Sequence, residues 1–303
     1  MVNITLLGCG GSLPTPNRFL TSLLINYKSY KILVDCGEGT QVSMKINNTG
    51  FKDISLICFT HFHADHAVGL PGLLLTIANS GRKYPLTIIG PMGCKNTIAG
   101  LRVLCPELPY EINIIETSNS SENIFSIEDI FVSSLNLDHT IPCNGYNFII
   151  KRKAKFDVQK AVNNKIPKFL WSQLQKHDSV EFEGKTYYSN MVLGEDRPGL
   201  KITYLTDTRP IQSIIPFASN SDLFICEGMY GEDTCLDKAL VNKHMLFSEA
   251  ATLALKSSVK ELWLTHFSPS LDTPEKHIEK AKNIFLNTEI GKDGMTKILK
   301  FSL

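Results

Sequence analysis

The seven residues Thr60–His66 have the sequence THFHADH, which contains three histidines and one aspartate. The apolar run 54–59 before them is typical of a buried strand, and residues 69–75 after them predict a turn into a buried helix with Pro71 near its start. The stretch therefore lies on a strand-to-helix loop. Neutral imidazole and carboxylate groups are good ligands for zinc and similar divalent ions, so this loop predicts a metal site.

The spacing within the loop suggests two metal ions. His61 and His63 are two residues apart, so an extended segment points both side chains the same way. Asp65 and His66 follow the turn and can serve a neighbouring ion. The alternative is a chance cluster on a solvated loop. Because the chain has only eight histidines in 303 residues, three of them within six positions beside an aspartate favour the metal site.

Length and composition exclude several classes of protein. A chain with 43% hydrophobic and 20% charged residues is typical of a soluble globular protein. The N-terminal residues 1–8 predict a strand rather than a signal peptide, and no apolar run is long enough to span a membrane. Eight cysteines occur without a CxxC pair, so we expect reduced thiols in a cytoplasmic protein. A net charge of +1 argues against nucleic-acid binding over the whole surface, but it leaves room for a local basic patch.

Further candidate ligands follow predicted strands later in the chain. His139 comes after a strand near 131–137, Asp207 after 200–206, and His266 after 261–265. In a layered sheet fold such groups gather at one edge of the sheet. We therefore expect two ligand groups and one bridging carboxylate. The first ion is assigned to His61, His63 and His139, the second to Asp65, His66 and His266, and the bridge to Asp207.

A site of this kind is suited to hydrolysis. Two ions about 3.5–4 Å apart activate a hydroxide at neutral pH and stabilise developing negative charge. A phosphodiester is the electrophile that gains most from such a pair. A binding module with a structural metal is disfavoured, because structural zinc sites are closed by four protein ligands, whereas seven ligands here leave room for water.

Two other segments have alternative interpretations. Asp35, at the end of a predicted strand, either caps the following helix or orients a metal-bound histidine, and the sequence favours neither. The Gly- and Pro-rich residues 8–18 form either a plain connection or a loop that approaches a ligand, since glycine permits a close approach.

Residues 151 to about 195 differ in character from the rest of the chain. Between 151 and 176 there are eight Lys and Arg residues against one acid, with three aromatic residues interleaved. We interpret 151–195 as an arm inserted into a single domain that spans 1–303. The arm is either a solvated basic surface or a surface that contacts a phosphate backbone. The density of cations with aromatic residues favours the second interpretation.

The motif at His61–His66 resembles the HxHxDH signature of the metallo-β-lactamase superfamily, and the wider pattern resembles the tRNase Z (ribonuclease Z) family. The supporting segments cover nearly the whole chain: residues 7–22, 35–41, 69–74, 137–139 with 145–146, 207–209 and 264–268. This resemblance implies an α/β fold, a four-layer αββα metallo-β-lactamase sandwich of two βαβ-type halves with an inserted exosite-like arm.

The resemblance also implies an activity. It implies a zinc-dependent phosphodiesterase, an endoribonuclease that cleaves the 3′ trailer of precursor tRNA through a metal-activated hydroxide. It implies two Zn²⁺ per chain, with Mn²⁺ or Fe as alternatives, and a homodimer. It makes Asp65 a general base as well as a ligand, His244 the contact to the scissile phosphate, and Glu227 the partner of His244 in proton transfer. The arm, with its basic residues 151–176, corresponds to the family's tRNA-binding exosite.

The chain departs from the family pattern outside the metal ligands. Pro16 and Phe19 replace a Lys and an Asn of the family, residues 226–229 are Cys-Glu-Gly-Met instead of His-Glu-Ala-Thr, and Ser270 and Leu271 replace Arg and Tyr. A small-molecule metallo-hydrolase on the same fold, of the phosphodiesterase, arylsulfatase or lactonase type, is therefore the alternative function.

Overall fold

The computed structural model describes residues 1–117 and 121–302. The chain divides into two units, of which the first comprises residues 1–149 and 200–300. The second comprises Ile150–Gly199 together with the C-terminal residues from Phe301. Within the described part of the chain, no helix has the length and apolar character needed to cross a membrane.

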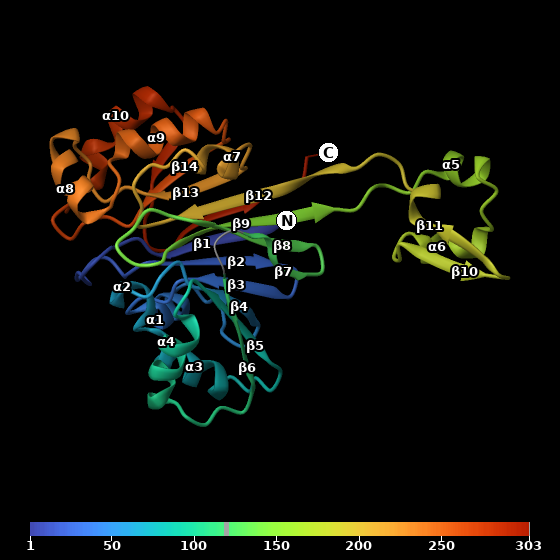
Figure 1. The fold of residues 1–303 in the computed structure, drawn as a ribbon, viewed down its shortest axis with the longest axis horizontal. Coiled ribbons are helices and arrows are strands. Elements are labelled where there is room, and N and C mark those ends of the chain that lie inside the picture. The colour runs from blue at the N-terminus through green and yellow to red at the C-terminus, as the bar shows by residue number, and fades with distance from the viewer. Residues whose placement is uncertain (118–120, 303) are drawn as a thin grey trace. The chain divides into compact units, whose positions relative to one another are not determined.

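The first unit contains two seven-stranded sheets (Figure 1). In the first sheet the strands lie in the order β16 (Met295–Leu299), β1 (Val2–Gly8), β2 (Ser22–Tyr27), β3 (Tyr30–Val34), β4 (Ile54–Cys58), β5 (Leu86–Gly90) and β6 (Ile112–Glu116). β1 pairs antiparallel with both of its neighbours, and β2 pairs antiparallel with β3. From β3 to β6 all pairings are parallel. The sheet is therefore antiparallel at one end and parallel at the other.

The second sheet repeats this arrangement. Its order is β15 (Thr288–Ile290), β14 (Leu262–Thr265), β13 (Leu223–Glu227), β12 (Arg197–Leu205), β9 (Asn144–Arg152), β8 (Ile130–Asn136) and β7 (Ser121–Ile127). The pairings from β12 to β15 are parallel, whereas β7 and β8 form an antiparallel hairpin. Each half of the unit thus contributes a mixed sheet with a parallel portion.

Helices cover the outer face of each sheet, so the unit has four layers (Figure 1). The helices beside the first sheet are α1 (Thr40–Ile46), α2 (Ala64–Ala67), α3 (Leu70–Asn79) and α4 (Cys94–Leu101), and those beside the second are α7 (Ile214–Ala218), α8 (Leu236–Asn242), α9 (Phe247–Lys256) and α10 (Ile278–Ile284). Short 3₁₀ turns accompany them: η1 (Arg102–Leu104), η4 (Asp233–Cys235) and η5 (Pro274–His277). The predicted αββα sandwich is confirmed.

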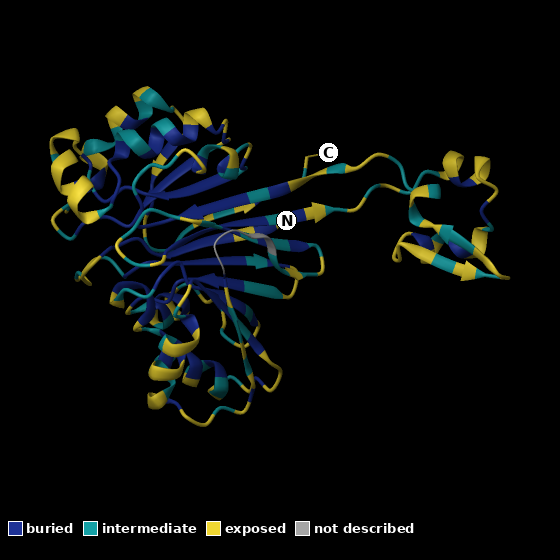
Figure 2. Cartoon of the chain, viewed as in Figure 1, coloured by how far each residue is buried: buried dark blue, intermediate teal, exposed yellow. Residues whose placement is uncertain are grey.

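The central strands between the helical layers are buried on both faces, whereas β6 and β16 are partly exposed; Figure 2 shows the buried residues in dark blue. β4 (ISLIC) and β13 (LFICE) are nearly continuous apolar runs, as expected for parallel strands covered on both sides. Two helices adjoin 3₁₀ turns: the turn η1 follows α4 after Leu101, and the turn η5 precedes α10. Such 3₁₀ turns are common at helix ends.

The parallel portions of both sheets bring several strand ends together. Asp35 follows β3, His61 lies shortly after β4, Asp207 follows β12 and His266 follows β14, while Glu227 is the last residue of β13. Parallel strands end at the same edge of their sheet, so these residues meet there. Three of them adopt left-handed backbone, with φ of 57° at Asp35, 56° at Asp207 and 58° at His266. This conformation is unfavourable for non-glycine residues and is concentrated at functional sites.

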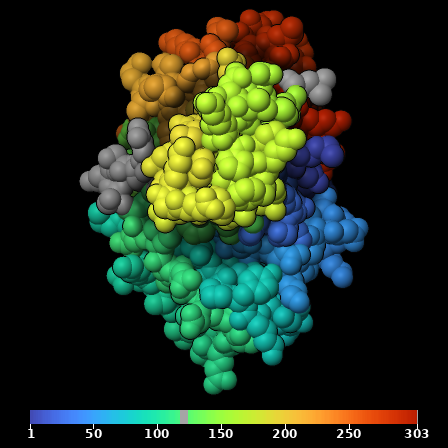
Figure 3. All heavy atoms as spheres, turned by 90° about the vertical axis from the view of Figure 1, so that its right-hand side faces the viewer, coloured from blue at the N-terminus to red at the C-terminus, as the bar shows by residue number. Residues whose placement is uncertain are grey.

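The second unit has a hydrophobic core of its own. Its elements are α5 (Val158–Asn163), η2 (Lys168–Leu170), α6 (Trp171–Leu174), β10 (Ser179–Phe182), β11 (Lys185–Tyr188) and η3 (Ser189–Met191). Five buried apolar residues form the core: Ala161, Ile166, Leu170, Leu174 and Val192. Figure 3 shows one face of this unit, in which the yellow-green and yellow residues pack closely together. The segment is therefore a folded unit and not an extended loop.

A buried arginine, which the sequence pattern did not single out, ties the β4–β5 side of the first sheet together. The guanidinium of Arg82 is fully buried and donates hydrogen bonds to the carbonyl oxygens of Lys52 (2.9 Å), Ile54 (2.5 Å), Tyr84 (2.8 Å) and Pro85. It also lies over the ring of Tyr84 at 4.1 Å. One side chain thus provides donors to four carbonyl groups.

We predict that Arg82→Leu lowers the free energy of unfolding by about 3 kcal/mol, because buried carbonyl groups lose their donors. Urea unfolding followed by circular dichroism measures this change. The matched control is Lys83→Leu at the adjacent exposed position, for which we expect a change within about 0.5 kcal/mol. Equal stability of the two variants would contradict the role given to Arg82.

Candidate dinuclear metal centre

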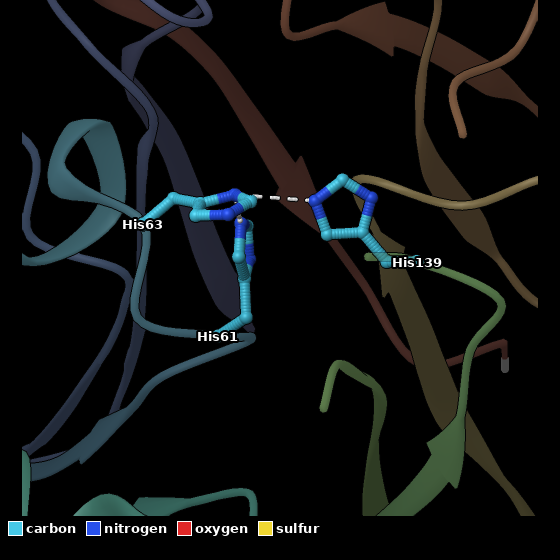
Figure 4. A group of neighbouring side chains, drawn as sticks. All are labelled: His61, His63 and His139. Atoms are coloured by element: carbon cyan, nitrogen blue, oxygen red, sulfur yellow. Dashed lines mark hydrogen bonds between the residues drawn. The ribbon is translucent and has the colours of Figure 1, made fainter. Parts of the chain in front are cut away.

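Three histidines from two distant segments form the first ligand group (Figure 4). His61 and His63 come from the loop after β4, and His139 comes from the loop after β8. The Nδ1 atom of His63 lies 3.0 Å from Nε2 of His61 and 3.2 Å from Nε2 of His139. Three ring nitrogens that converge in this way leave a space between their lone pairs that suits a divalent ion.

A second group lies beside the first and joins the two halves of the unit. It consists of Asp65 and His66 from the start of α2 together with His266 after β14. The Nε2 atoms of His66 and His266 are 3.1 Å apart. The Oδ2 atom of Asp65 lies 3.4 Å from Nε2 of His266 and 3.5 Å from Nε2 of His66. All three residues are buried.

The carboxylate of Asp207 lies between the two groups. Its Oδ1 atom is 3.9 Å from Nε2 of His61 and 3.8 Å from Nε2 of His139. Its Oδ2 atom is 3.2 Å from Nε2 of both His66 and His266. Each oxygen therefore faces one ligand group, which is the arrangement that a bridging ligand requires. The structure brings together all seven residues that the sequence predicted as ligands.

Unsatisfied polar atoms provide a test of whether a metal fits. Within the described residues, Oδ2 of Asp207 and Nδ1 of His266 are buried without a hydrogen-bond partner. Buried polar atoms in proteins nearly always have a partner. A carboxylate oxygen that faces two imidazole nitrogens at 3.2 Å without a hydrogen bond is oriented as a metal ligand would be. The donor set of imidazoles and carboxylates fits divalent metal ions.

Asp35 lies behind this centre and orients one of its histidines. Its Oδ2 atom is 2.9 Å from Nδ1 of His66, and its carboxylate accepts hydrogen bonds from the N–H and the hydroxyl of Thr60, both at 2.8 Å. The residue before α1 is Gly39, and no side chain caps this helix. Of the two interpretations of Asp35, the structure therefore favours the orienting carboxylate. Such partners fix the tautomer and the direction of a metal-bound histidine.

Charges within the centre shift the protonation of its members. Burial and the neighbouring His66 hold the pKa of His61 well below its usual value, which keeps this imidazole neutral. Burial alone would lower the pKa of His66, but the carboxylates of Asp207 and Asp35 outweigh it and raise that pKa well above its usual value. Burial would raise the pKa of Asp207, yet the surrounding histidines hold it well below normal. The centre therefore combines a neutral His61 and an ionised Asp207 with a His66 whose protonated form the two carboxylates favour.

The Gly-rich loop 8–18 contacts the metal centre through its backbone. The N–H of Ser12 donates a hydrogen bond of 2.7 Å to Oδ2 of Asp65. Ser12 has a φ of 64°, which turns this N–H toward the carboxylate. A side chain at Gly11 would place its Cβ 2.5 Å from the ring of His266. The loop is thus more than a connection, because it approaches two of the candidate ligands.

Glu227 and His244 form a pair next to the ligand groups. Oε2 of Glu227 lies 3.1 Å from Nδ1 of His244 and also accepts the N–H of Met245 at 3.1 Å, while its Oε1 accepts the N–H of Thr208. Glu227 is fully buried. Burial alone would lower the pKa of His244, but Glu227 outweighs it and raises that pKa to about 9. His244 therefore carries a proton at neutral pH beside the candidate ligands.

These groups open into one pocket of about 400 Å³. It is lined by Ser12, His63, Asp65, His139, Thr140, Asp207, Met229, Tyr230, Val241, Asn242, His244 and Ser268. His244 also lies close enough to Asp207 and His266 to complete a further possible ligand group. The sequence analysis assigned no role in the site to the four residues at 229–230 and 241–242. Their only signal in the sequence is that each lies within three residues of Glu227 or His244.

Both a family model and individual known proteins match this chain. The family model of the anti-Pycsar protein Apyc1 matches residues 2–96, which is about a third of the chain. The protein named ribonuclease Z from Clostridium acetobutylicum is 57% identical over 306 residues and covers 99% of both chains. The protein of the same name from Clostridium tetani is 54% identical over 310 residues, again with 99% of both chains covered.

A solved structure supports the architecture. Human tRNase Z, short form, matches with a TM-score of 0.70 and 24% identity, and the match covers 99% of this chain and 100% of the human chain. At this identity the likeness concerns the fold. The sequence identity to the clostridial proteins, over the full length of each chain, concerns the family. The resemblance inferred from the motifs is confirmed, and the chain belongs to the ribonuclease Z family of metallo-β-lactamase-fold proteins.

Proposed function

We propose that this protein is a metal-dependent endoribonuclease that removes the 3′ trailer of precursor tRNA. The observation that supports this function most directly is the convergence of seven candidate ligands and the Glu227–His244 pair beside one open pocket, which is lined by His63, Asp65, His139, Asp207 and His244. Membership of the ribonuclease Z family gives the reaction class and the substrate. The departures at positions 16, 19 and 270–271 lie outside the seven ligands and leave the proposed chemistry intact.

The proposed cofactor is a pair of zinc ions, with Mn²⁺ or Fe as alternatives. His61, His63 and His139 would hold one ion, and Asp65, His66 and His266 the other, with Asp207 shared between them. When bound, the pair would supply a nucleophile at neutral pH and neutralise charge on the phosphate.

The residues around the ions have distinct proposed tasks. Asp65 acts as ligand and general base, and the Ser12 N–H holds its carboxylate in place. His244 contacts the scissile phosphate and donates its proton to the leaving oxygen as the P–O bond breaks. Glu227 keeps His244 protonated and fixes its ring through Nδ1. The pair thus forms a general acid of the kind that contributes about 10²- to 10⁴-fold to a rate.

The second unit is the proposed tRNA-binding surface. Residues 151–199 contain ten Lys and Arg against six Asp and Glu. Cations of this kind neutralise phosphates and bind nucleic acid without reading its sequence. Phe169, which is 58% exposed, adds an aromatic surface. The homodimer and the cytoplasmic location stay predictions.

The decisive experiment is incubation of the zinc-loaded protein with a precursor tRNA that carries a 3′ trailer. We expect one cut at the 3′ end of the mature tRNA, mapped by primer extension or sequencing. Hydrolysis of bis-p-nitrophenyl phosphate, an aryl sulfate or a lactone without cleavage of the precursor would support the alternative small-molecule hydrolase.

The metal assignment predicts that His63→Ala and Asp65→Ala abolish hydrolysis of both precursor tRNA and bis-p-nitrophenyl phosphate, since each removes one ligand. Elemental analysis should find two zinc ions per wild-type chain and less in each variant. Chelation should inactivate the wild type, and added Zn²⁺ should restore it. Circular dichroism controls for the fold. Retained turnover in either variant would show that the ligand assignment is wrong.

The proposed acid predicts that His244→Ala lowers kcat by about 10²- to 10⁴-fold while zinc content stays unchanged. Glu227→Gln should lower kcat and shift the alkaline limb of the pH–rate profile to lower pH, because the charge that raises the pKa of His244 is removed. A loss of zinc from the His244 variant would instead make this residue a ligand.

The proposed role of the arm predicts that changes to it lower activity on precursor tRNA but not on a small phosphodiester. Replacing the exposed Lys155, Lys165 and Lys168 by Glu should lower kcat/KM for precursor tRNA by about tenfold or more. The slope of log(kcat/KM) against log salt concentration should become shallower by about two to three. Hydrolysis of bis-p-nitrophenyl phosphate should not change. The same reversal at Lys45, Lys52 and Lys83 of the first unit is the control. An equal loss of kcat/KM for precursor tRNA in the two triple variants would contradict a special role of the arm.

A further inference from the structure

The pocket at the metal centre is lined by two chemically different sets of residues. One set comprises candidate ligands and His244. The other includes Met229, Tyr230 and Val241, which are neither candidate ligands nor part of the proposed proton transfer. Val241 is 78% exposed and Tyr230 is partly exposed, whereas Met229 is buried. Tyr230 and Val241 thus offer exposed apolar surface in the lining of the pocket that also holds candidate ligands.

Tyr230 is the aromatic member of this second set, and hydrogen bonds hold both its backbone and its hydroxyl group. Its N–H donates to the carbonyl of Met245 (3.3 Å), and its own carbonyl accepts the N–H of Phe247 (3.0 Å). At the far end of the ring, the side-chain amide of Asn242 donates to Oη at 2.9 Å. The side chain nevertheless remains partly exposed in the pocket. The ring is therefore a surface fixed before a substrate arrives.

The ring lies close to the proposed phosphate contact. Its centroid is 6.5 Å from that of His244, and the two rings are nearly perpendicular at 78°. In a nucleic acid, a single sugar separates each base from its phosphate. A phosphate at His244 therefore brings an adjoining base within reach of Tyr230.

We propose that Tyr230, flanked by Met229 and Val241, is a stacking subsite for a nucleobase next to the scissile phosphate. The inference rests on the proposed function, because it assumes that a nucleic acid enters this pocket. Stacking on an aromatic ring tolerates every base, since each base has a π-face. This suits an enzyme whose substrates differ in sequence at the cut, whereas a hydrogen-bonding pocket would select one base.

Two small phosphodiesters test the subsite without tRNA. Thymidine 5′-(p-nitrophenyl) phosphate and methyl p-nitrophenyl phosphate share a leaving group and differ in whether a nucleoside is present. With zinc-loaded enzyme, Tyr230→Ala should lower kcat/KM for the thymidine ester by about 5- to 150-fold, the range for one lost base–aromatic stack. The methyl ester should be hydrolysed as by the wild type. Tyr230→Phe keeps the ring and should retain most of the preference for the thymidine ester.

Precursor tRNA with one abasic nucleotide identifies the side of the cut on which the base lies. The contacted base lies either just before or just after the cut. On the precursor that lacks this base, kcat/KM of the wild type should fall by the same factor. Tyr230→Ala should lose nothing further on that precursor, because the two changes remove one interaction. Tyr30→Ala is the control, since this partly exposed tyrosine lies at the other end of β3 from Asp35.

The outcomes separate this inference from the proposed function. Equal losses on both small esters, or a full additional loss on every abasic precursor, would overturn the stacking subsite while precursor cleavage by the wild type still stood. If the wild type hydrolyses the small esters but leaves the precursor intact, the proposed function fails. Zinc content equal to that of the wild type in Tyr230→Ala, together with an unchanged rate on the methyl ester, shows that the variant keeps its fold and its metal centre.

Discussion

The buried carboxylate of Asp207 is the constraint around which the first unit is built. A charge removed from water is costly unless other groups compensate it, and Asp207 is only 2% exposed. Imidazoles from both halves of the unit surround it: His61 and His139 face one oxygen, and His66 and His266 face the other. The parallel strands of both sheets must end at this point for these groups to meet. The sandwich therefore brings the edges of the two sheets together at one carboxylate.

The support behind the centre is as specific as the ligands themselves. Asp35 fixes His66, and the Ser12 N–H fixes Asp65, while Glu227 fixes His244. Each of these contacts comes from a different segment of the chain. Asp35, Asp207 and His266 adopt left-handed backbone, which is energetically unfavourable, so local backbone strain is concentrated at the same place. Rigid positioning of this kind is what a reaction centre requires.

The sequence predicted the centre well because its signals are local. The spacing of His61, His63 and His66, and the position of Asp207 and His266 at strand ends, are visible along the chain. The sequence offered an orienting role for Asp35 and an approach to a ligand by the loop that contains Ser12 only as alternatives, because a hydrogen bond to a partner more than 30 residues away depends on tertiary structure. Arg82 was missed for the same reason. Tyr230 was missed because its importance depends on a pocket that only the folded chain forms.

The two ligand groups differ in how far apart their members lie in the sequence. His61, His63 and His139 belong to the first half of the chain, whereas His66 meets His266 across 200 positions. A ribosome adds roughly 5–20 residues per second, and N-terminal segments fold first. During synthesis the residues of the first candidate group therefore exist before the second group is complete. Under the proposed ligand assignment, the centre is whole only when residue 266 has been added.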